Sequence, residues 1–316
     1  MDDFQALAAR PIFQEDSVNT PTQRMTEIIA LQRELGGVGY VAESTLAAAL
    51  LLMLKLGRPL LVEGDAGVGK TEIAKALAAV RGARLIRLQC YEGLDVHAAM
   101  YEWNYQRQLL AIKLLEQDER PTSVKEQDIF SERYLLKRPL LEAISCAEQP
   151  VLLIDEVDRA DEAFEAYLLE LLSDFQMSIP ELGTVRAVTK PLVLITSNGT
   201  RELSDALRRR CLYQYIDYPT FAKELAIVEI RAPQAAGQFA HQVVDFVQSV
   251  RRMDLQKKPG IAETLDWTAA LLRMGISVIN EDGAERILET LSALIKTRDD
   301  RAGFTREVVA RVAASC

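Results

Sequence analysis

The feature that most constrains the fold is a glycine-rich segment, GDAGVGKT, at residues 64–71. It satisfies the pattern G-x-x-x-x-G-K-[ST], follows the apolar run LLVE, and precedes the helix-forming run EIAKALAAV. Glycines at 64, 67 and 69 let the backbone turn so that successive N–H groups face inward, and the next helix adds its positive end. The segment therefore predicts a phosphate-binding loop, the alternative being a glycine-rich turn with a surface lysine.

Short apolar runs bounded by turn or helix signals recur along the chain. They are LLVEG (60–64), RLIRLQC (84–90), VLLIDE (151–156), LVLITSN (192–198) and LYQYIDY (212–218). Helical patterns lie between them, at 71–79, 135–147 and 162–175. Near-continuous apolar strands that alternate with helices indicate an α/β fold with a parallel five-stranded sheet. Ligands of such a sheet collect at the carboxyl ends of its strands.

The pattern divides the chain into three parts. We expect an N-terminal arm at 1–22, an α/β nucleotide-binding domain at 23–218 and a small all-α lid of four or five helices at 219–316. A charged insertion at about 93–132 interrupts the α/β alternation, and a β-hairpin is expected at about 176–191.

Composition limits the classes of partner. The 316 residues can bury one full α/β domain and a smaller second one. A net charge of −9 argues against a surface built for nucleic acid. The four cysteines lie far apart, which favours reduced thiols over a metal site. The acidic N-terminus and the short apolar stretches predict a cytoplasmic protein without a membrane span.

The phosphate loop and the run VLLIDE together predict a site for ATP and Mg²⁺. Lys70 would reach the β- and γ-phosphates, and Thr71 would offer its hydroxyl to Mg²⁺. Asp155 can hold the water shell of Mg²⁺, and Glu156 can polarise a water for attack on the γ-phosphate. The alternative for the two carboxylates is a solvated strand end. The residues expected to bind the nucleotide are Gly64, Asp65, Ala66, Gly67, Val68, Gly69, Lys70, Thr71 and Glu72.

Further candidates follow the last two strand-like runs. Asn198 ends one run and is suited to orient the attacking water or sense the γ-phosphate, unless it only forms a turn into Gly199. The segment ALRRRC places adjacent arginines before the final strand. Charge in phosphoryl transfer is often neutralised by an arginine from a neighbouring subunit, and we expect Arg210, then Arg209, in this role. The alternative is a solvated basic run.

This order of features resembles that of the AAA+ ATPases over nearly the whole chain from about Met25. The insertion and the hairpin look like those of the helix-two-insert clade. The best match within the clade is the MoxR family, and more narrowly the CoxD-type proteins associated with carbon monoxide dehydrogenase and related molybdenum hydroxylases. The segments that carry it are EGDAGVGKTEIAKALA, RLIRLQCYEGLDVHAAMYEWNYQRQLL, DIFSERYLLKRPLLEAI and AETLDW.

The resemblance implies a homo-oligomer, a hexameric ring, that acts as a chaperone. It would remodel a client metalloenzyme during cofactor maturation, together with a von Willebrand factor A domain protein. Many AAA+ lids carry a sensor arginine where this chain has Asp266, so either Arg251 or Arg252 takes that role or the lid senses nucleotide differently. Family position also places Tyr40 near adenine.

Other functions compatible with the same motifs are a nucleic-acid-directed motor, a motor subunit of a metal chelatase and a nucleotide-switched scaffold. The acidic charge argues against the first of these. Glu156 argues against the scaffold, which would need no group to activate water.

Overall fold

The computed structural model describes residues 21–115, 121 and 128–316. Within them, five strands form one parallel sheet in the order β2-β5-β8-β1-β9. The strands are β1 (Leu60–Glu63), β2 (Leu85–Gln89), β5 (Val151–Asp155), β8 (Leu192–Ser197) and β9 (Leu212–Tyr215). The α/β fold predicted from the five apolar runs is therefore confirmed.

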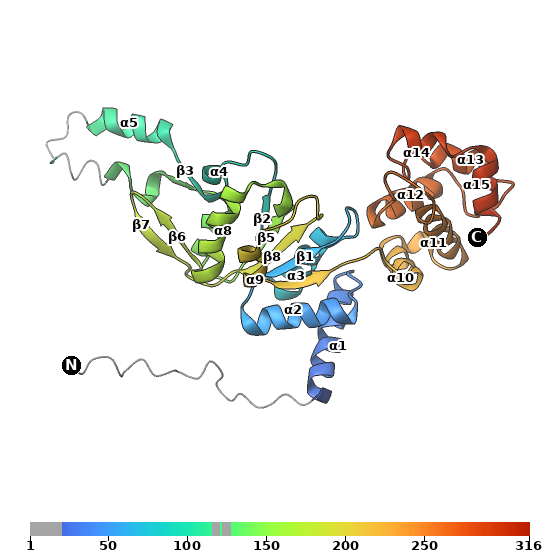
Figure 1. Ribbon diagram of the computed structural model, residues 1–316, viewed down its shortest axis with the longest axis horizontal. Helices are drawn as coiled ribbons and strands as arrows, with labels where there is room; N and C mark the ends of the chain where they lie inside the picture. The colour runs from blue at the N-terminus through green and yellow to red at the C-terminus, as the bar shows by residue number, and fades with distance from the viewer. Residues whose placement is uncertain (1–20, 116–120, 122–127) are drawn as a thin grey trace.

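Helices cover both faces of this sheet (Figure 1). They are α1 (Pro21–Gly37), α2 (Ser44–Leu56), α3 (Lys70–Arg81), α7 (Pro139–Ser145), α8 (Glu162–Asp174) and α9 (Asp205–Arg210), with a 3-10 turn at Val157–Arg159. In β1, Leu60 and Val62 pack with the core under α1, α2 and α3, whereas Leu61 packs with the core under α7 and α8. Burial on both faces explains why the central strands are apolar throughout.

The insertion contains two described helices, α4 (Val96–Met100) and α5 (Tyr105–Leu115). Two short strands, β3 (Tyr101–Trp103) before α5 and β4 (Leu135–Lys137) after it, pair with each other antiparallel. A 3-10 turn at Glu132–Tyr134 precedes β4. Parts of the predicted insertion, 116–120 and 122–127, lie outside the described residues.

The helix predicted over 135–147 is wrong at its start, because its first residues form β4 and α7 begins only at Pro139. Proline fits the first position of a helix and holds the preceding residue extended. The predicted hairpin is present as β6 (Gln176–Ile179) and β7 (Gly183–Arg186). Helix α1 already begins at Pro21, inside the predicted arm, and residues 1–20 of that arm lie outside the described residues.

Residues 219–316, all of them described, are helical without a strand. We call them the helical region; its elements are α10 (Phe221–Arg231), α11 (Gln238–Arg251), α12 (Ile261–Arg273), α13 (Ala284–Thr290), α14 (Arg298–Ala302), α15 (Arg306–Ala313) and a 3-10 turn at Pro233–Ala235. These six α-helices exceed the four or five expected, because α14 is too short to show a helical period. Trp267 stacks on Phe246 at the centre of their core, with ring centroids 4.8 Å apart.

None of the helices in the described part of the chain combines the length and apolarity that a bilayer crossing requires. All four cysteines are free thiols, and burial raises the pKa of Cys90 and Cys211 to about 12.

Candidate nucleotide-binding site

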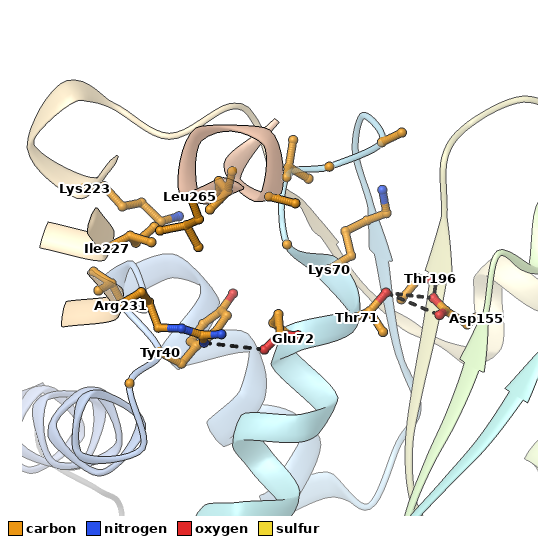
Figure 2. Close-up of a pocket in the computed structure, with 18 of the residues that line it drawn as sticks. Tyr40, Lys70, Thr71, Glu72, Asp155, Thr196, Lys223, Ile227, Arg231 and Leu265 are labelled. Carbon is orange, nitrogen blue, oxygen red and sulfur yellow. Dashed lines mark hydrogen bonds and ion pairs between the residues drawn. The ribbon is translucent and has the colours of Figure 1, made fainter. Parts of the chain in front are cut away.

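A pocket of about 310 Å³ lies where the ends of β5 and β8 and the start of α3 meet the helical region. Figure 2 shows the loop before α2 on one side of it, the start of α3 below it, and α10 and α12 across from α3. Besides Tyr40, which family position placed near adenine, the lining residues outside the predicted set are Gly39, Val41, Thr196, Lys223, Ile227, Arg231, Ile261, Ala262 and Leu265. The pocket therefore draws on both the sheet and the helical region.

The backbone of the phosphate loop depends on glycine. Gly67 and Gly69 have φ values of 85° and 94°, in the left-handed region that other residues rarely adopt. At Gly64, a Cβ atom would lie 2.1 Å from the carbonyl oxygen of Ile216. Helix α3 begins at Lys70, so its positive end faces the loop, as an anion site requires.

Lys70 is buried and points along the loop. Its Nζ donates to the carbonyl oxygens of Gly64 and Asp65, at 2.7 and 2.8 Å, and to Oδ1 of Asn198 at 2.8 Å. Burial lowers the pKa of the Lys70 ammonium, although nearby carboxylates, Asp158 foremost, oppose the shift. The structure thus brings together Lys70 and Asn198, which follow two different strands and which the sequence predicted to share one site.

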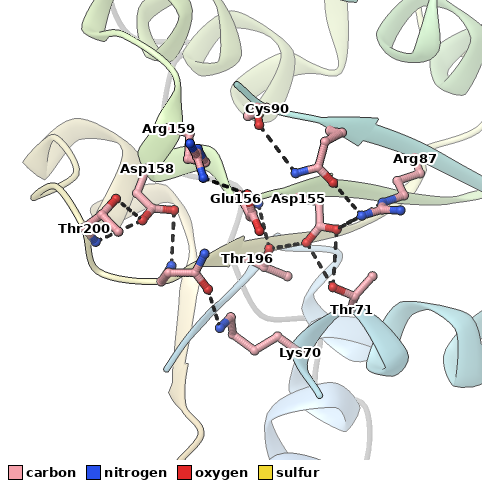
Figure 3. Close-up of polar contacts among 12 residues, drawn as sticks. Lys70, Thr71, Arg87, Cys90, Asp155, Glu156, Asp158, Arg159, Thr196 and Thr200 are labelled. Atoms are coloured by element: carbon pink, nitrogen blue, oxygen red, sulfur yellow. Dashed lines mark hydrogen bonds and ion pairs between the residues drawn. The ribbon is translucent and has the colours of Figure 1, made fainter. Parts of the chain in front are cut away.

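Asp155, at the end of β5, is buried beside Thr71 (Figure 3). The Thr71 hydroxyl lies 3.2 and 3.3 Å from the two carboxylate oxygens, and the Thr196 hydroxyl donates to Oδ1 at 2.6 Å. Hydroxyl and carboxylate oxygens are the ligands that Mg²⁺ prefers, so these residues fit the metal. Arg87 from β2 also donates to this carboxylate, a contact that sequence reasoning missed.

Glu156 follows in an unusual backbone conformation. Its φ of 55° is left-handed, which is rare for a residue other than glycine, and its N–H donates to the Thr196 hydroxyl at 2.8 Å. Its carboxylate lies 3.9 Å from the Arg159 guanidinium. Both Asp155 and Glu156 line the pocket. Because the backbone turns at Glu156, the two neighbouring carboxylates occupy different places in it.

A third carboxylate, Asp158, organises the segment that follows β8. It accepts hydrogen bonds from the backbone N–H groups of Asn198, at 3.2 Å, and Thr200, at 3.0 Å, and from the Thr200 hydroxyl at 2.6 Å. Burial raises the pKa of Asp158, but these hydrogen bonds lower it by more, so the net shift is downward. Asp158 therefore positions Asn198. Its place three residues after Asp155 was the available sequence signal.

The two arginines predicted to act in phosphoryl transfer, Arg210 and Arg209, lie outside the pocket. Arg210 donates from Nε to the Ser173 hydroxyl at 2.6 Å, and the Arg209 side chain is largely exposed, 4.0 Å from Asp205. Within the described part of the chain, neither of them lines the pocket.

Two basic residues of α10, Lys223 and Arg231, do line the pocket and were missed. Lys223 is 2.8 Å from Glu43, and Arg231 is 3.8 Å from Glu72. Their spacing, eight residues apart on one helix face with Ile227 between them, could have indicated this surface.

The candidates for a sensor arginine, at the end of α11 and just after it, do not line the pocket. Arg251 is buried against Glu224, and Arg252 is exposed. Leu265 rather than its neighbour Asp266 lines the pocket. Tyr40 does line it, as expected, and burial raises the pKa of its hydroxyl.

The profile of the AAA domain (dynein-related subfamily) matches residues 59–211, which contain the loop, Asp155, Glu156 and Asn198. These residues form an AAA+ ATPase domain. This domain binds ATP with Mg²⁺ and hydrolyses ATP. The gas vesicle ATPase GvpN of Ancylobacter aquaticus is 25% identical over 271 residues, which cover 82% of this chain and 72% of GvpN.

Solved structures show weaker similarity. The Thermotoga maritima RuvB Holliday junction branch migration motor aligns at 19% identity and a TM-score of 0.42, over 85% of this chain and 71% of RuvB. A candidate ATPase from Cytophaga hutchinsonii aligns at 15% identity and a TM-score of 0.46, over 92% of this chain and 86% of that protein.

Proposed function

We propose that this AAA+ ATPase is a MoxR-type chaperone of the CoxD group, which remodels a client metalloenzyme of the molybdenum hydroxylase class in the cytoplasm. The observation that carries the proposal is the pairing of an ATP site with an apolar insertion helix. Helix α5 exposes Tyr105, Leu109, Leu110 and Leu114. Figure 1 places α5 at the end of the molecule opposite the helical region. Clustered exposed apolar side chains are typical of protein-binding surfaces.

In the proposed site, each polar side chain has one role. Lys70 binds the β- and γ-phosphates, and Thr71 and Asp155 hold Mg²⁺, which neutralises phosphate charge when bound. Glu156 accepts a proton from the attacking water, and Asn198 orients that water from its position beside Lys70. The hydrogen bonds of Asp158 to the Asn198 segment keep this residue in place.

The proposed assembly is a hexameric ring in which Arg210, and secondarily Arg209, reach the nucleotide of the neighbouring subunit. Their position supports this, since both lie outside the pocket of their own chain. A von Willebrand factor A domain protein is the proposed partner that links the ring to its client.

The test compares the ATPase activity of the wild type, Glu156→Gln and Arg210→Ala. Each variant alone should lose about 100-fold or more in rate, since each removes a group that acts in phosphoryl transfer. Mixing the variants should restore part of the activity, in particles several subunits large, because one mixed interface has both groups. Full activity of Arg210→Ala in a monomeric particle would contradict the ring.

A second candidate comes from the similarity to GvpN, namely a gas vesicle ATPase. Glu156→Gln should trap a client because it binds ATP without hydrolysing it. Capture with this variant, and with Lys70→Ala as the matched control that binds no ATP, distinguishes the candidates. Enrichment of a molybdenum hydroxylase supports the chaperone proposal, and enrichment of gas vesicle proteins instead contradicts it.

A further inference from the structure

Arg87 lies beside the metal-binding carboxylate because of strand pairing. Strand β2 runs parallel to β5 at the edge of the sheet, with Gln89 opposite Asp155. Arg87, two residues earlier, lies on the same face as Gln89, and its side chain extends toward the strand end (Figure 3). Its Nε and Nη2 atoms both donate to Oδ2 of Asp155, at 3.0 and 2.5 Å.

This contact uses the acceptor capacity of Asp155. Oδ2 accepts both bonds from Arg87 and lies 3.3 Å from the Thr71 hydroxyl, and Oδ1 accepts from Thr196. A carboxylate oxygen has two lone pairs. A Mg²⁺ ion or its bound water therefore meets an oxygen that already has a cationic partner.

Arg87 is able to leave. Its side chain is 50% exposed, whereas that of Asp155 is 3% exposed. Its Nη2 also reaches Oε1 of Gln89, which gives the guanidinium a neutral partner on its own strand. Because the guanidinium is half exposed, water can solvate it once it leaves, and Asp155 keeps its contacts with Thr71 and Thr196.

We propose that Arg87 competes with Mg²⁺ for Asp155 and so sets the Mg²⁺ concentration at which the site loads. Two cations near one carboxylate repel each other, and the repulsion is greater where one side of the group is buried. A residue of β2, at the edge of the sheet, thereby controls how readily the site binds Mg²⁺. This inference rests on the proposed role of Asp155 in holding Mg²⁺.

The opposite role would be that Arg87 orients Asp155 for the metal. The two roles differ in sign. Removing a competitor strengthens metal binding, and removing a positioning group weakens it.

The experiment measures metal binding instead of turnover. With protein in excess over ADP, Mn²⁺ is titrated and free Mn²⁺ is followed by electron paramagnetic resonance for wild type, Arg87→Gln, Asp155→Asn and Arg84→Gln. Arg84 is the matched control, because it precedes the same strand and pairs with Glu142, away from the site.

Arg87→Gln should lower the midpoint of the Mn²⁺ titration about three- to tenfold. Arg84→Gln should leave it unchanged, and Asp155→Asn should raise it. If Asp155→Asn weakens Mn²⁺ binding but the midpoint in Arg87→Gln is unchanged or raised, the competition proposal is overturned. If Asp155→Asn has no effect, the assignment of Asp155 to the metal is what fails.

Discussion

Two of the arginine–carboxylate pairs in this molecule differ in how far the arginine is exposed to solvent. In the helical region, the side chains of Arg251 and Glu224 are 6% and 0% exposed. At the nucleotide site, Arg87 is half exposed although its partner Asp155 is buried.

The contacts around each pair differ as well. Arg251 also donates to the carbonyl oxygen of Pro259 at 2.6 Å and to the Thr264 hydroxyl at 3.2 Å, and Glu224 accepts from Gln248 at 2.7 Å. An enclosed pair with several further hydrogen bonds holds three helices in one arrangement. A pair that is open on one side can exchange partners, which suits a site that binds a cation.

The largest expected effect tests the enclosed pair. Arg251→Met should lower the free energy of unfolding by about 3–5 kcal/mol, because it leaves the Glu224 carboxylate buried without its cation. Urea unfolding measures this loss. Arg87→Met is the control and should lose less, because Asp155 lines the pocket and keeps its hydrogen bonds with Thr71 and Thr196. Equal losses in the two variants would show that burial does not distinguish these pairs.

The second prediction concerns how the enclosed pair positions the helical region on the phosphate loop. Arg251 holds Pro259, and at the next residue, Gly260, a Cβ atom would lie 2.6 Å from the Gly67 carbonyl oxygen. That oxygen accepts the N–H of Ile261 at 2.9 Å. Gly260→Ala must push α12 from the loop and break this bond.

The affinity for a fluorescent ATP analogue should therefore fall about tenfold in Gly260→Ala. The control is Gly36→Ala, where a Cβ atom meets nothing within 4 Å. Wild-type affinity in Gly260→Ala would mean that the backbone contact does not hold the pocket together.

The smallest effect concerns Asp158, a site carboxylate held by neutral donors rather than by an arginine. Its pKa in the folded state lies below the ordinary value of 3.8. The resulting stabilisation is fully present above about pH 4 and is lost as the pH falls through the folded-state pKa. Asp158→Asn should cost about 1 kcal/mol at pH 7 and less at pH 3, as measured by urea unfolding. A cost that does not change with pH would contradict the charge-based account.

Much of the site was predictable because its parts are local in sequence. A buried parallel strand shows as an apolar run, and the ends of such strands meet at one edge, so Lys70, Asp155 and Asn198 could be placed together before the structure was known. Arg87 could not, because a half-exposed arginine in a strand looks like any solvent-facing residue until β2 is known to pair with β5. Similarly, three residues of β4 are too few to show a strand period, and only pairing with β3 defines them.

The position of β2 at the edge of the sheet has a mechanical consequence. Within the described residues it pairs with β5 alone, and the chain that leaves it leads into the insertion, which contains α4. Tension applied at the insertion would pass along the backbone to a strand held by one ladder of hydrogen bonds. Slippage of that ladder would draw Arg87 away from Asp155, while β5 stays in place in the sheet. A pulling force on the insertion would therefore change the surroundings of the metal-binding carboxylate first.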